Sequence, residues 1–270
     1  MTRLTLPFFS ASTITLLAIV SVVHLSARNT RAASASDGTP RTPVLIELFT
    51  SEGCSDCPPA DALLQRLDRS QPVNGAELIV LSEHVDYWNG IGWKDPYSSH
   101  EYSQRQGTYA GLFGLGSVYT PQMIVDGRFE FVGSDERRAI QAVENASQTE
   151  KITVNLTSVH AEPNHMLALH IDAAQLPSSS TAKSASVLLA IADESDESHV
   201  SGGENGGRTL KHIAVVRSLA RVGTVDQSES LSRDLKIKIG SERENMRLVA
   251  FVQEENTGKV WGVGSARFSK

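Results

Sequence analysis

The chain has 270 residues, a formal net charge of −6 and a pI of about 5.8. This acidic balance argues against a general nucleic-acid-binding protein, which is usually basic. Hydrophobic residues make up 40% of the chain and charged residues 21%, values that are typical of a globular protein and exclude extended disorder.

The N-terminus predicts export. Arg3 is followed by a run over 4–27 that contains no Lys, Arg, Asp or Glu, and Ala33–Ala35 offers small residues for cleavage. This pattern indicates a signal peptide over 1–35, although the run is long enough for an uncleaved membrane anchor. In either case we expect a periplasmic or secreted protein, in a compartment where disulfides persist, whose contact with a membrane is limited to this segment. Residues 36–42 form a polar linker.

From Val44 to about Glu150, short apolar runs alternate with stretches of helical spacing. After Pro58, apolar residues recur at the i, i+3, i+4 and i+7 positions of a helix, and proline is tolerated in the first turn. We therefore expect an α/β domain over 43–150. Its expected strands are 44–50 and 77–86 with a hairpin over 121–133, and its expected helices are 58–69, 98–112 and 134–146.

After Lys151 the pattern changes to seven strand candidates with no convincing helix between them. Several alternate with period two, as in the run around Ile237. Strands at this density predict an all-β, sandwich-like domain over 151–270. The candidates are 152–159, 166–173, 186–193, 212–222, 234–240, 246–254 and 259–268.

The only two cysteines, Cys54 and Cys57, lie between the first strand and the first helix. A disulfide closing so short a loop stabilises a fold by only about 2 kcal/mol, so a purely structural bond is the weaker interpretation. Structural zinc usually takes four protein ligands, and a second cysteine pair is missing, which leaves histidines to complete such a site. A C-x-x-C pair at this position is typical of a dithiol redox motif, with Cys54 attacking and Cys57 resolving the mixed disulfide.

This strand, the C-x-x-C pair and its helix are followed by the stretch YTPQMIVDGRFEFVGSDE, and together they resemble the thioredoxin superfamily. The later stretch is particularly similar to glutaredoxins. The resemblance implies a thioredoxin-like fold over 43–150, with a cis peptide bond at Thr120–Pro121 facing the dithiol. The whole of 43–270, including SEHVDYWNGIGWKDP and SGGENGGR, also resembles a secreted thioredoxin-like family of unknown function.

Acidic residues surround the cysteine pair. Ser55 and Asp56 lie between the cysteines, and Glu52 lies just upstream. Nearby negative charge disfavours a thiolate, so we expect a reducing or neutral potential for this pair rather than a strongly oxidising one.

The expected substrate groove comprises Thr120, Ser55, Asp56, His84 and Trp88. His84 and Asp86 follow the strand at 77–86 and are candidates for proton transfer or metal binding, and Tyr87, Trp88 and Trp93 are candidates for an apolar wall. The alternative is that these aromatic side chains only pack this segment onto the sheet.

Three further features of the sequence each have more than one interpretation. Glu47 accepts the proton of Cys57 if it points beneath the helix, and is otherwise a rim carboxylate. Helix N-termini bind anions, and the resemblance to glutaredoxins implies glutathione binding at Gly133–Glu136, with Pro121 in the same groove. The Gly-rich run from Ser201 lacks the setting of a phosphate loop and predicts a hairpin or interdomain loop. Within and after it, Arg208 and His212 are candidates for contact with the first domain or a partner.

The preferred function is thiol–disulfide exchange with a protein or small-molecule thiol, without a cofactor other than the disulfide. A second hypothesis is a Cu(I)-handling protein that uses Cys54, Cys57 and His84. A third is an envelope binding module whose disulfide takes no part in catalysis. In none of the three is nucleic acid a partner.

Overall fold

The computed structural model describes residues 1–2, 41–240 and 245–269. The chain divides into two units, Met1–Gly38 and Thr39–Lys270, and the second contains every described helix and strand. The predicted signal peptide or anchor, apart from Met1 and Thr2, lies outside the described residues. Within the described part of the chain, no helix is both long enough and apolar enough to cross a membrane.

The first half of the second unit contains four strands and three helices in the expected order. Its apolar runs form strands and its amphipathic stretches form helices, as their periodicity predicts. α2 begins where the Ser99 hydroxyl accepts a hydrogen bond from the Glu101 amide, and ends at Gly114 in the left-handed conformation. The elements are β1 (Thr42–Thr50), α1 (Pro58–Ser70), β2 (Ala76–His84), α2 (His100–Phe113), β3 (Gln122–Val125), β4 (Phe129–Val132) and α3 (Glu136–Ser147).

The described part of the second half contains seven strands, one at each expected position. β7 and β8 extend beyond the predicted bounds because they pair with each other as far as His199 and Thr209, through polar residues that alone would not indicate a strand. The strands are β5 (Val154–Glu162), β6 (Met166–Ala173), β7 (Ala185–His199), β8 (Thr209–Val225), β9 (Leu231–Lys238), β10 (Asn245–Gln253) and β11 (Val260–Ser269).

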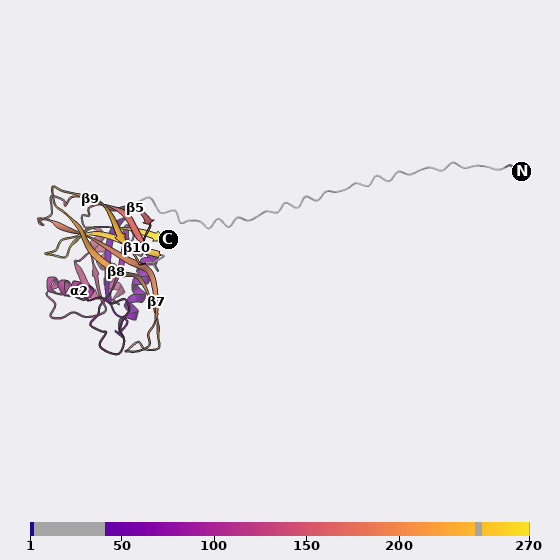
Figure 1. Cartoon of the computed structure of the whole chain (residues 1–270), viewed down its shortest axis with the longest axis horizontal. Helices are drawn as coiled ribbons and strands as arrows, with labels where there is room; N and C mark the ends of the chain where they lie inside the picture. The colour runs from indigo at the N-terminus through magenta and orange to yellow at the C-terminus, as the bar shows by residue number, and fades with distance from the viewer. Residues whose placement is uncertain (3–40, 241–244, 270) are drawn as a thin grey trace. The chain divides into compact units, whose positions relative to one another are not determined.

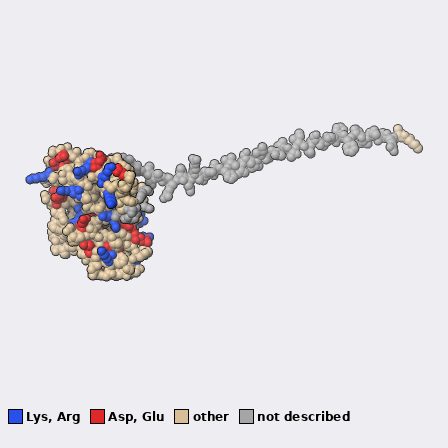
Figure 2. Space-filling view, in the orientation of Figure 1, with Lys and Arg blue, Asp and Glu red and all other residues tan. Residues whose placement is uncertain are grey.

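The fold is mixed α/β and rich in sheet. One eight-stranded sheet has the order β11-β10-β7-β8-β2-β1-β3-β4, and a three-stranded sheet has the order β5-β6-β9. In Figure 1, β5 and β9 lie at the upper end of the second unit and α2 at its lower left. Acidic and basic side chains are interspersed on the face that Figure 2 shows.

The large sheet crosses the predicted domain boundary near Glu150. β8 pairs with β2 in parallel through Val215 and Ser82, which joins strands from both halves. The boundary therefore marks a change in the type of element, while one sheet and one compact unit continue across it.

One hydrophobic core lies between the eight-stranded sheet and the three-stranded sheet. It contains Leu169 and Ile171 of β6 together with Val187 of β7, Leu248 of β10 and Trp261 of β11. Two sheets that share a core in this way give the second half its layered architecture.

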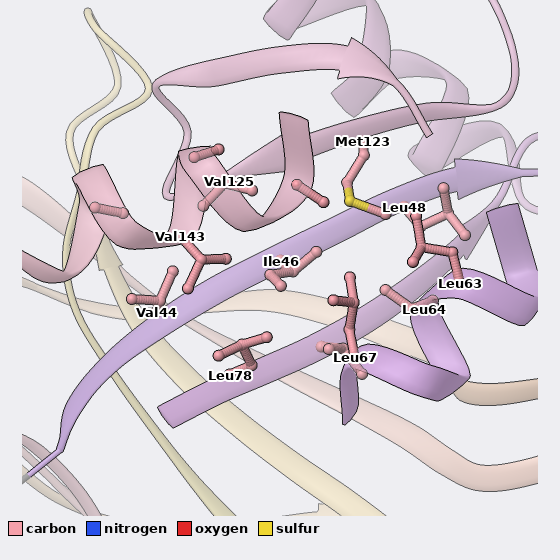
Figure 3. Packing of buried hydrophobic residues seen from close by; sticks show 14 of the residues in the cluster. Val44, Ile46, Leu48, Leu63, Leu64, Leu67, Leu78, Met123, Val125 and Val143 are labelled. Atoms are coloured by element: carbon pink, nitrogen blue, oxygen red, sulfur yellow. The ribbon is translucent and has the colours of Figure 1, made fainter. Parts of the chain in front are cut away.

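Strand β1 presents different side chains to its two faces. Val44, Ile46 and Leu48 pack against the apolar faces of α1 and α3 (Figure 3). Leu45 and Phe49 point to the opposite face and belong to other clusters. Since side chains alternate along a strand, Glu47 also faces away from α1.

Candidate functional site

Cys54 and Cys57 form a disulfide at the start of α1, with their Cα atoms 5.4 Å apart. β1 delivers the chain to this point, Cys57 is the N-cap of the helix, and Pro58 occupies the first turn, where its missing amide leaves no hydrogen bond unmade. Cys54 is 1% exposed and Cys57 is fully buried, whereas Ser55 and Asp56 between them are exposed. The pair is thus placed at a helix N-terminus but covered by other parts of the chain.

The loop between β7 and β8, which we call the 200–208 loop, binds the backbone of the cysteine motif. Glycines allow its tight turns, since Gly203 and Gly207 have positive φ angles of 68° and 83°. The loop also lies against the segment after β2: a Cβ atom on Gly202 would be 2.3 Å from the carbonyl oxygen of Gly92. Only a residue without a side chain permits this approach.

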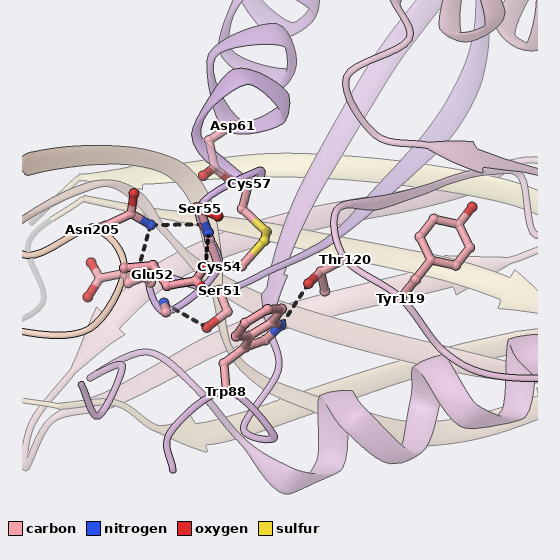
Figure 4. Close-up of a disulfide and its surroundings, with 12 residues drawn as sticks. Ser51, Glu52, Cys54, Ser55, Cys57, Asp61, Trp88, Tyr119, Thr120 and Asn205 are labelled. Atoms are coloured by element: carbon pink, nitrogen blue, oxygen red, sulfur yellow. Dashed lines mark hydrogen bonds between the residues drawn. A yellow bond between two sulfur atoms is a disulfide. The ribbon is translucent and has the colours of Figure 1, made fainter. Parts of the chain in front are cut away.

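Asn205 of the 200–208 loop is fully buried and binds the backbone on both sides of Gly53. Its Nδ2 donates to the carbonyl oxygens of Glu52 at 2.9 Å and Cys54 at 2.8 Å (Figure 4). A guanidinium nitrogen of Arg208 donates to Asn205 Oδ1 at 2.7 Å, which fixes the orientation of the amide. Asn205 therefore joins this loop to the first half directly and Arg208 orients it, while the predicted contact of His212 with the first half is made at Glu52 Oε1, 3.2 Å away.

Glu204 makes the third contact between this loop and the cysteine motif. Its Oε2 accepts a hydrogen bond from the Ser55 amide at 3.0 Å. The hydrogen bonds from Ser55 hold the pKa of the Glu204 carboxyl below its ordinary value, so this exposed group is negatively charged at neutral pH.

Aromatic residues after β2 close another side of the site. Trp88 donates from Nε1 to Thr120 Oγ1 at 2.8 Å, and a Cβ atom on Gly53 would lie 2.9 Å from Trp88 Cβ. The Thr120–Pro121 peptide bond is cis, as the resemblance implies. Trp88 and Thr120 therefore lie next to the cysteine motif, whereas Tyr87 is 43% exposed.

Behind the cysteine motif is a buried cluster of five ionisable side chains, Glu52, Asp61, His84, Asp95 and His212, which we call the His212 cluster. Glu52 Oε1 lies 3.2 Å from His212 Nε2, and Asp61 Oδ2 lies 3.9 Å from His212 Nδ1. Asp95 Oδ2 lies 2.8 Å from His84 Nδ1 and accepts the Glu52 amide at 2.9 Å. The two imidazole rings are in edge contact, with centroids 4.6 Å apart.

The electrostatics of the His212 cluster favour a protonated His212. Burial alone lowers its pKa, but the hydrogen bond to Glu52 and the charges of Asp61, Glu52 and Asp95 raise it above the ordinary value. Burial raises the pKa of Asp61 despite the nearby imidazoles. Burial likewise acts to raise the pKa of Asp95, but the charge and hydrogen bond of His84 leave it lowered. Aspartates in one cluster thus differ in how readily they hold a proton.

Comparisons with known proteins follow the same elements. A model of a family of unknown function, DUF1223, matches residues 45–253. The chain belongs to this family. The match includes the C-x-x-C motif, the aromatic segment after β2 and the 200–208 loop, so this DUF1223 protein carries all the described site elements within the family region.

Two solved structures are similar to this DUF1223 protein. The crystal structure of protein AGR_C_4864 from Agrobacterium tumefaciens has a TM-score of 0.61 and 24% identity, and the alignment covers 85% of this chain and 95% of that one. HBP35 of Porphyromonas gingivalis has a TM-score of 0.62 and 14% identity, with 85% and 76% covered. At these identities the likeness concerns the fold alone. A search of the curated proteins found no match.

The structure does not bring Glu47 to the cysteines. Glu47 lies on the α2 face of the sheet, where Arg105 Nε donates to its Oε1 at 2.7 Å and the Tyr109 hydroxyl donates to its Oε2 at 2.6 Å. It is neither a proton acceptor beneath α1 nor a rim carboxylate, but one member of a buried ion pair. The carboxylate near Cys57 is instead Asp61, which follows it by one helical turn.

The other expected residues have separate environments. His84 is fully buried against Asp95, and its Nε2 has no hydrogen-bond partner among the described residues. Asp86 accepts from the Ser103 hydroxyl instead of joining the His212 cluster. Trp93 donates to Glu52 Oε2 at 2.8 Å. Within the described ranges, no group of three His, Cys, Asp or Glu side chains is arranged to hold a metal ion. The Cu(I) hypothesis stays a prediction.

The N-terminus of α3 is occupied by the chain itself. The helix begins two residues after the predicted start, with Asp135 as its N-cap, and the Asp135 carboxylate accepts a hydrogen bond from the Arg138 amide at 3.0 Å. Gly133 lies against Pro121, since a Cβ atom on this glycine would be 3.2 Å from Pro121 Cβ. Glutathione binding at this helix stays a prediction.

Sequence reasoning missed Asn205, Glu204, Asp61 and Asp95. Asp61 carried a signal: it is an acid on the apolar face of α1, four residues after Cys57, and residues so spaced share a helix face. For Asn205 the glycines around it indicated a close approach of two backbones, but nothing in the spacing indicated which segment it approaches.

Proposed function

We propose that this DUF1223 protein is a thiol–disulfide oxidoreductase that uses Cys54 and Cys57. The observation that carries the proposal is the position of the disulfide, between the end of β1 and the first turn of α1, with Cys57 as N-cap. The positive end of the helix dipole stabilises a thiolate at such a position. A disulfide placed there is easier to open than one in a neutral environment.

A thioredoxin-like arrangement of the first half supports the same proposal. β1, the cysteine pair and α1 lead through β2 and α2 to the cis Thr120–Pro121 bond, the β3–β4 hairpin and α3, in the order that the resemblance implies. Trp88 and Thr120 are among the residues around the disulfide in Figure 4, which supports them as one wall of the substrate groove. The exposed Ser55 and Asp56 form its outer edge.

In the proposed exchange, the thiolate of a protein or small molecule bonds to Cys54 Sγ. The bond between Cys54 and Cys57 breaks, and Cys57 leaves as a thiolate that takes a proton. A second external thiolate then releases Cys54, which also takes a proton, and the external pair becomes a disulfide. The reverse direction follows the same steps.

We assign the proton exchange of Cys57 to Asp61. The two residues share a helix face, since they are one turn apart in α1. Burial raises the pKa of Asp61, so its carboxyl holds a proton at a higher pH than an ordinary aspartate. His212 lies between this carboxyl and Glu52, with its ring nitrogens 3.9 Å from Asp61 Oδ2 and 3.2 Å from Glu52 Oε1.

The N-terminal pattern supports export, and hence an oxidising compartment where an external partner resets the pair. The residues that would be the signal peptide lie mostly outside the described structure, so export remains part of the proposal.

The proposal is tested by titrating the full chain against mixtures of reduced and oxidised glutathione and trapping free thiols by alkylation. We expect the pair to open and close reversibly at one potential. In Asp61→Asn the potential should remain measurable, while the rate of reduction falls about a hundredfold, because the nearby proton donor is lost. Glu77→Gln, which changes an exposed carboxyl on β2, is the control.

A disulfide that resists reduction across all glutathione ratios would reject thiol–disulfide exchange. Equal reduction rates for the parent protein and Asp61→Asn would reject only the role of Asp61.

A further inference from the structure

The 200–208 loop binds backbone groups on both sides of Cys54. Asn205 Nδ2 donates to the carbonyl oxygens of Glu52 and Cys54, and Glu204 accepts from the Ser55 amide. Asn205 is fully buried in this position. These contacts come from the loop between β7 and β8, about 150 residues away in sequence, as the separation of 151 between Asn205 and Cys54 shows.

We propose that Asn205 is a positioning residue that favours the oxidised form of the Cys54–Cys57 pair and thereby lowers its reduction potential, with Glu204 acting in the same direction. This inference rests on the proposed function, because it concerns the equilibrium of the same disulfide.

The first reason is geometric. The loop is fitted to a cysteine motif closed by a covalent bond, with the Cα atoms 5.4 Å apart. When this bond breaks, the two sulfur atoms must move apart to non-bonded contact, and we infer that the Cys54 carbonyl group, which Asn205 binds, moves with them. A group that binds one of two states more tightly moves the equilibrium toward that state. Asn205 donates a hydrogen bond to the carbonyl oxygen of Cys54 itself, so this movement weakens the hydrogen bond in the reduced form.

The second reason is electrostatic. Glu204 places a carboxylate on the amide of Ser55, the residue after Cys54. A negative charge nearby disfavours a thiolate on Cys54, and so does the burial of this residue, which is 1% exposed. Both effects act only on the reduced form, since a disulfide carries no charge. They therefore add to the geometric effect.

The equilibrium to be measured is balanced with glutathione. Two glutathione thiols supply two electrons and two protons, the bond between Cys54 and Cys57 breaks, and the bond of glutathione disulfide forms. Cys57 ends as a thiol, and Cys54 ends partly as a thiol and partly as a thiolate that has released its proton to solvent; the charge of Glu204 acts on this thiolate fraction. The equilibrium constant of this reaction reports the preference of the protein for its oxidised form.

We would measure this constant for the full chain, Asn205→Ala and Glu204→Gln. Asn205→Ala removes two hydrogen bonds to the motif and should raise the constant toward reduction about tenfold, which corresponds to about 30 mV. Glu204→Gln keeps an acceptor for the Ser55 amide but removes the charge, and should raise it about threefold. The matched control is Glu197→Gln, which removes the same charge from β7, where Glu197 pairs with Lys211.

The outcomes separate this inference from the proposed function. A measurable potential that stays within about twofold of the parent equilibrium constant in both loop variants would overturn the role of Asn205 and Glu204, and leave the exchange proposal intact. A disulfide that no glutathione mixture reduces, in the parent or the variants, would overturn both. If Asn205→Ala does not fold, the exposed Glu204→Gln still decides: no rise relative to Glu197→Gln counts against the inference.

Discussion

Two buried charge clusters lie on opposite faces of the same strand pair, and they differ in what supplies the positive charge. On the α2 face, Glu47 and Glu83 surround Arg105, whose Nε lies 2.7 Å from Glu47 Oε1 and 3.5 Å from Glu83 Oε1. On the α1 face, the His212 cluster relies on imidazoles. A guanidinium remains charged at any ordinary pH, whereas an imidazole titrates near neutrality.

The comparison teaches that a buried charge does not by itself mark a functional site. Glu47 lies within an apolar strand, a position that suggested a catalytic role. However, both of its carboxylate oxygens accept hydrogen bonds, one from Arg105 and one from Tyr109. Burial by itself lowers the pKa of Arg105, but Glu47, Tyr109 and Glu83 outweigh this effect and raise the pKa above its ordinary value. The guanidinium therefore stays charged, and the ion pair persists. The His212 cluster, which can change its protonation and adjoins the disulfide, is the better candidate for chemistry.

The largest expected effect is a loss of stability when the cluster on the α2 face, formed by Glu47, Glu83 and Arg105, is broken. Arg105→Met leaves Glu47 buried without its cation, and should reduce the free energy of unfolding by about 3–5 kcal/mol, as measured by urea denaturation. Arg66→Met is the matched control, because Arg66 pairs with Glu136 at a site where both side chains are more than half exposed. There we expect a loss below about 1 kcal/mol. Similar losses in the two variants would contradict the argument that the buried Arg105 ion pair matters more for stability than an exposed one.

Arg105→Met also sharpens the assignment of function. If the α2-face cluster is structural, the reduction potential of the cysteine pair in any folded fraction should equal that of the parent protein. The same holds for Glu47→Gln. A shift in potential in either variant would return Glu47 to the candidate site.

The next effect concerns pH. The folded-state pKa of His212 is raised, so its protonated form contributes stability that is fully present below the unfolded pKa of about 6.5 and is lost as pH rises through the folded value. His212→Gln should therefore cost more stability at pH 6 than at pH 9. The limiting slope is about 1.4 kcal/mol per pH unit for one proton. Urea denaturation at several pH values measures it.

The control for this prediction is His170→Gln. Hydrogen bonds to Asp234 and Asp172 also raise the pKa of His170, but this side chain is on the surface, where solvent screens the interaction. A pH dependence in His212→Gln no larger than in His170→Gln would show that the buried cluster does not hold a proton on His212.

The smallest expected effect is a change in reduction potential when the exposed Asp56, between the two cysteines, is neutralised. Asp56→Asn removes a negative charge that disfavours the thiolate, and should raise the reduction potential by about 10 mV, because solvent screens an exposed charge. Titration against glutathione measures the change, with Glu197→Gln as the reference for removal of a remote charge. A fall in potential would contradict the electrostatic argument.

Most elements of the fold were predictable because local periodicity determines them. The apolar spacing after Pro58 gives α1, and the alternation around Ile237 gives β9. The pairing of β8 with β2 was not predictable, because it joins distant segments through a single register pair, Ser82 with Val215. As a result the sequence suggested two domains where one sheet runs through both halves.

By itself, the sequence determined the disulfide motif and its place between a strand and a helix. These follow from residue types and short spacings that act locally, whereas the cis Thr120–Pro121 bond was expected from the resemblance to glutaredoxins. Only the tertiary structure decided that Asn205 binds the backbone carbonyl of Cys54, that Asp61 rather than Glu47 lies near Cys57, and that His212 adjoins both Glu52 and Asp61. Each depends on which face of a strand or loop meets another segment, and long-range packing, not local spacing, sets that choice.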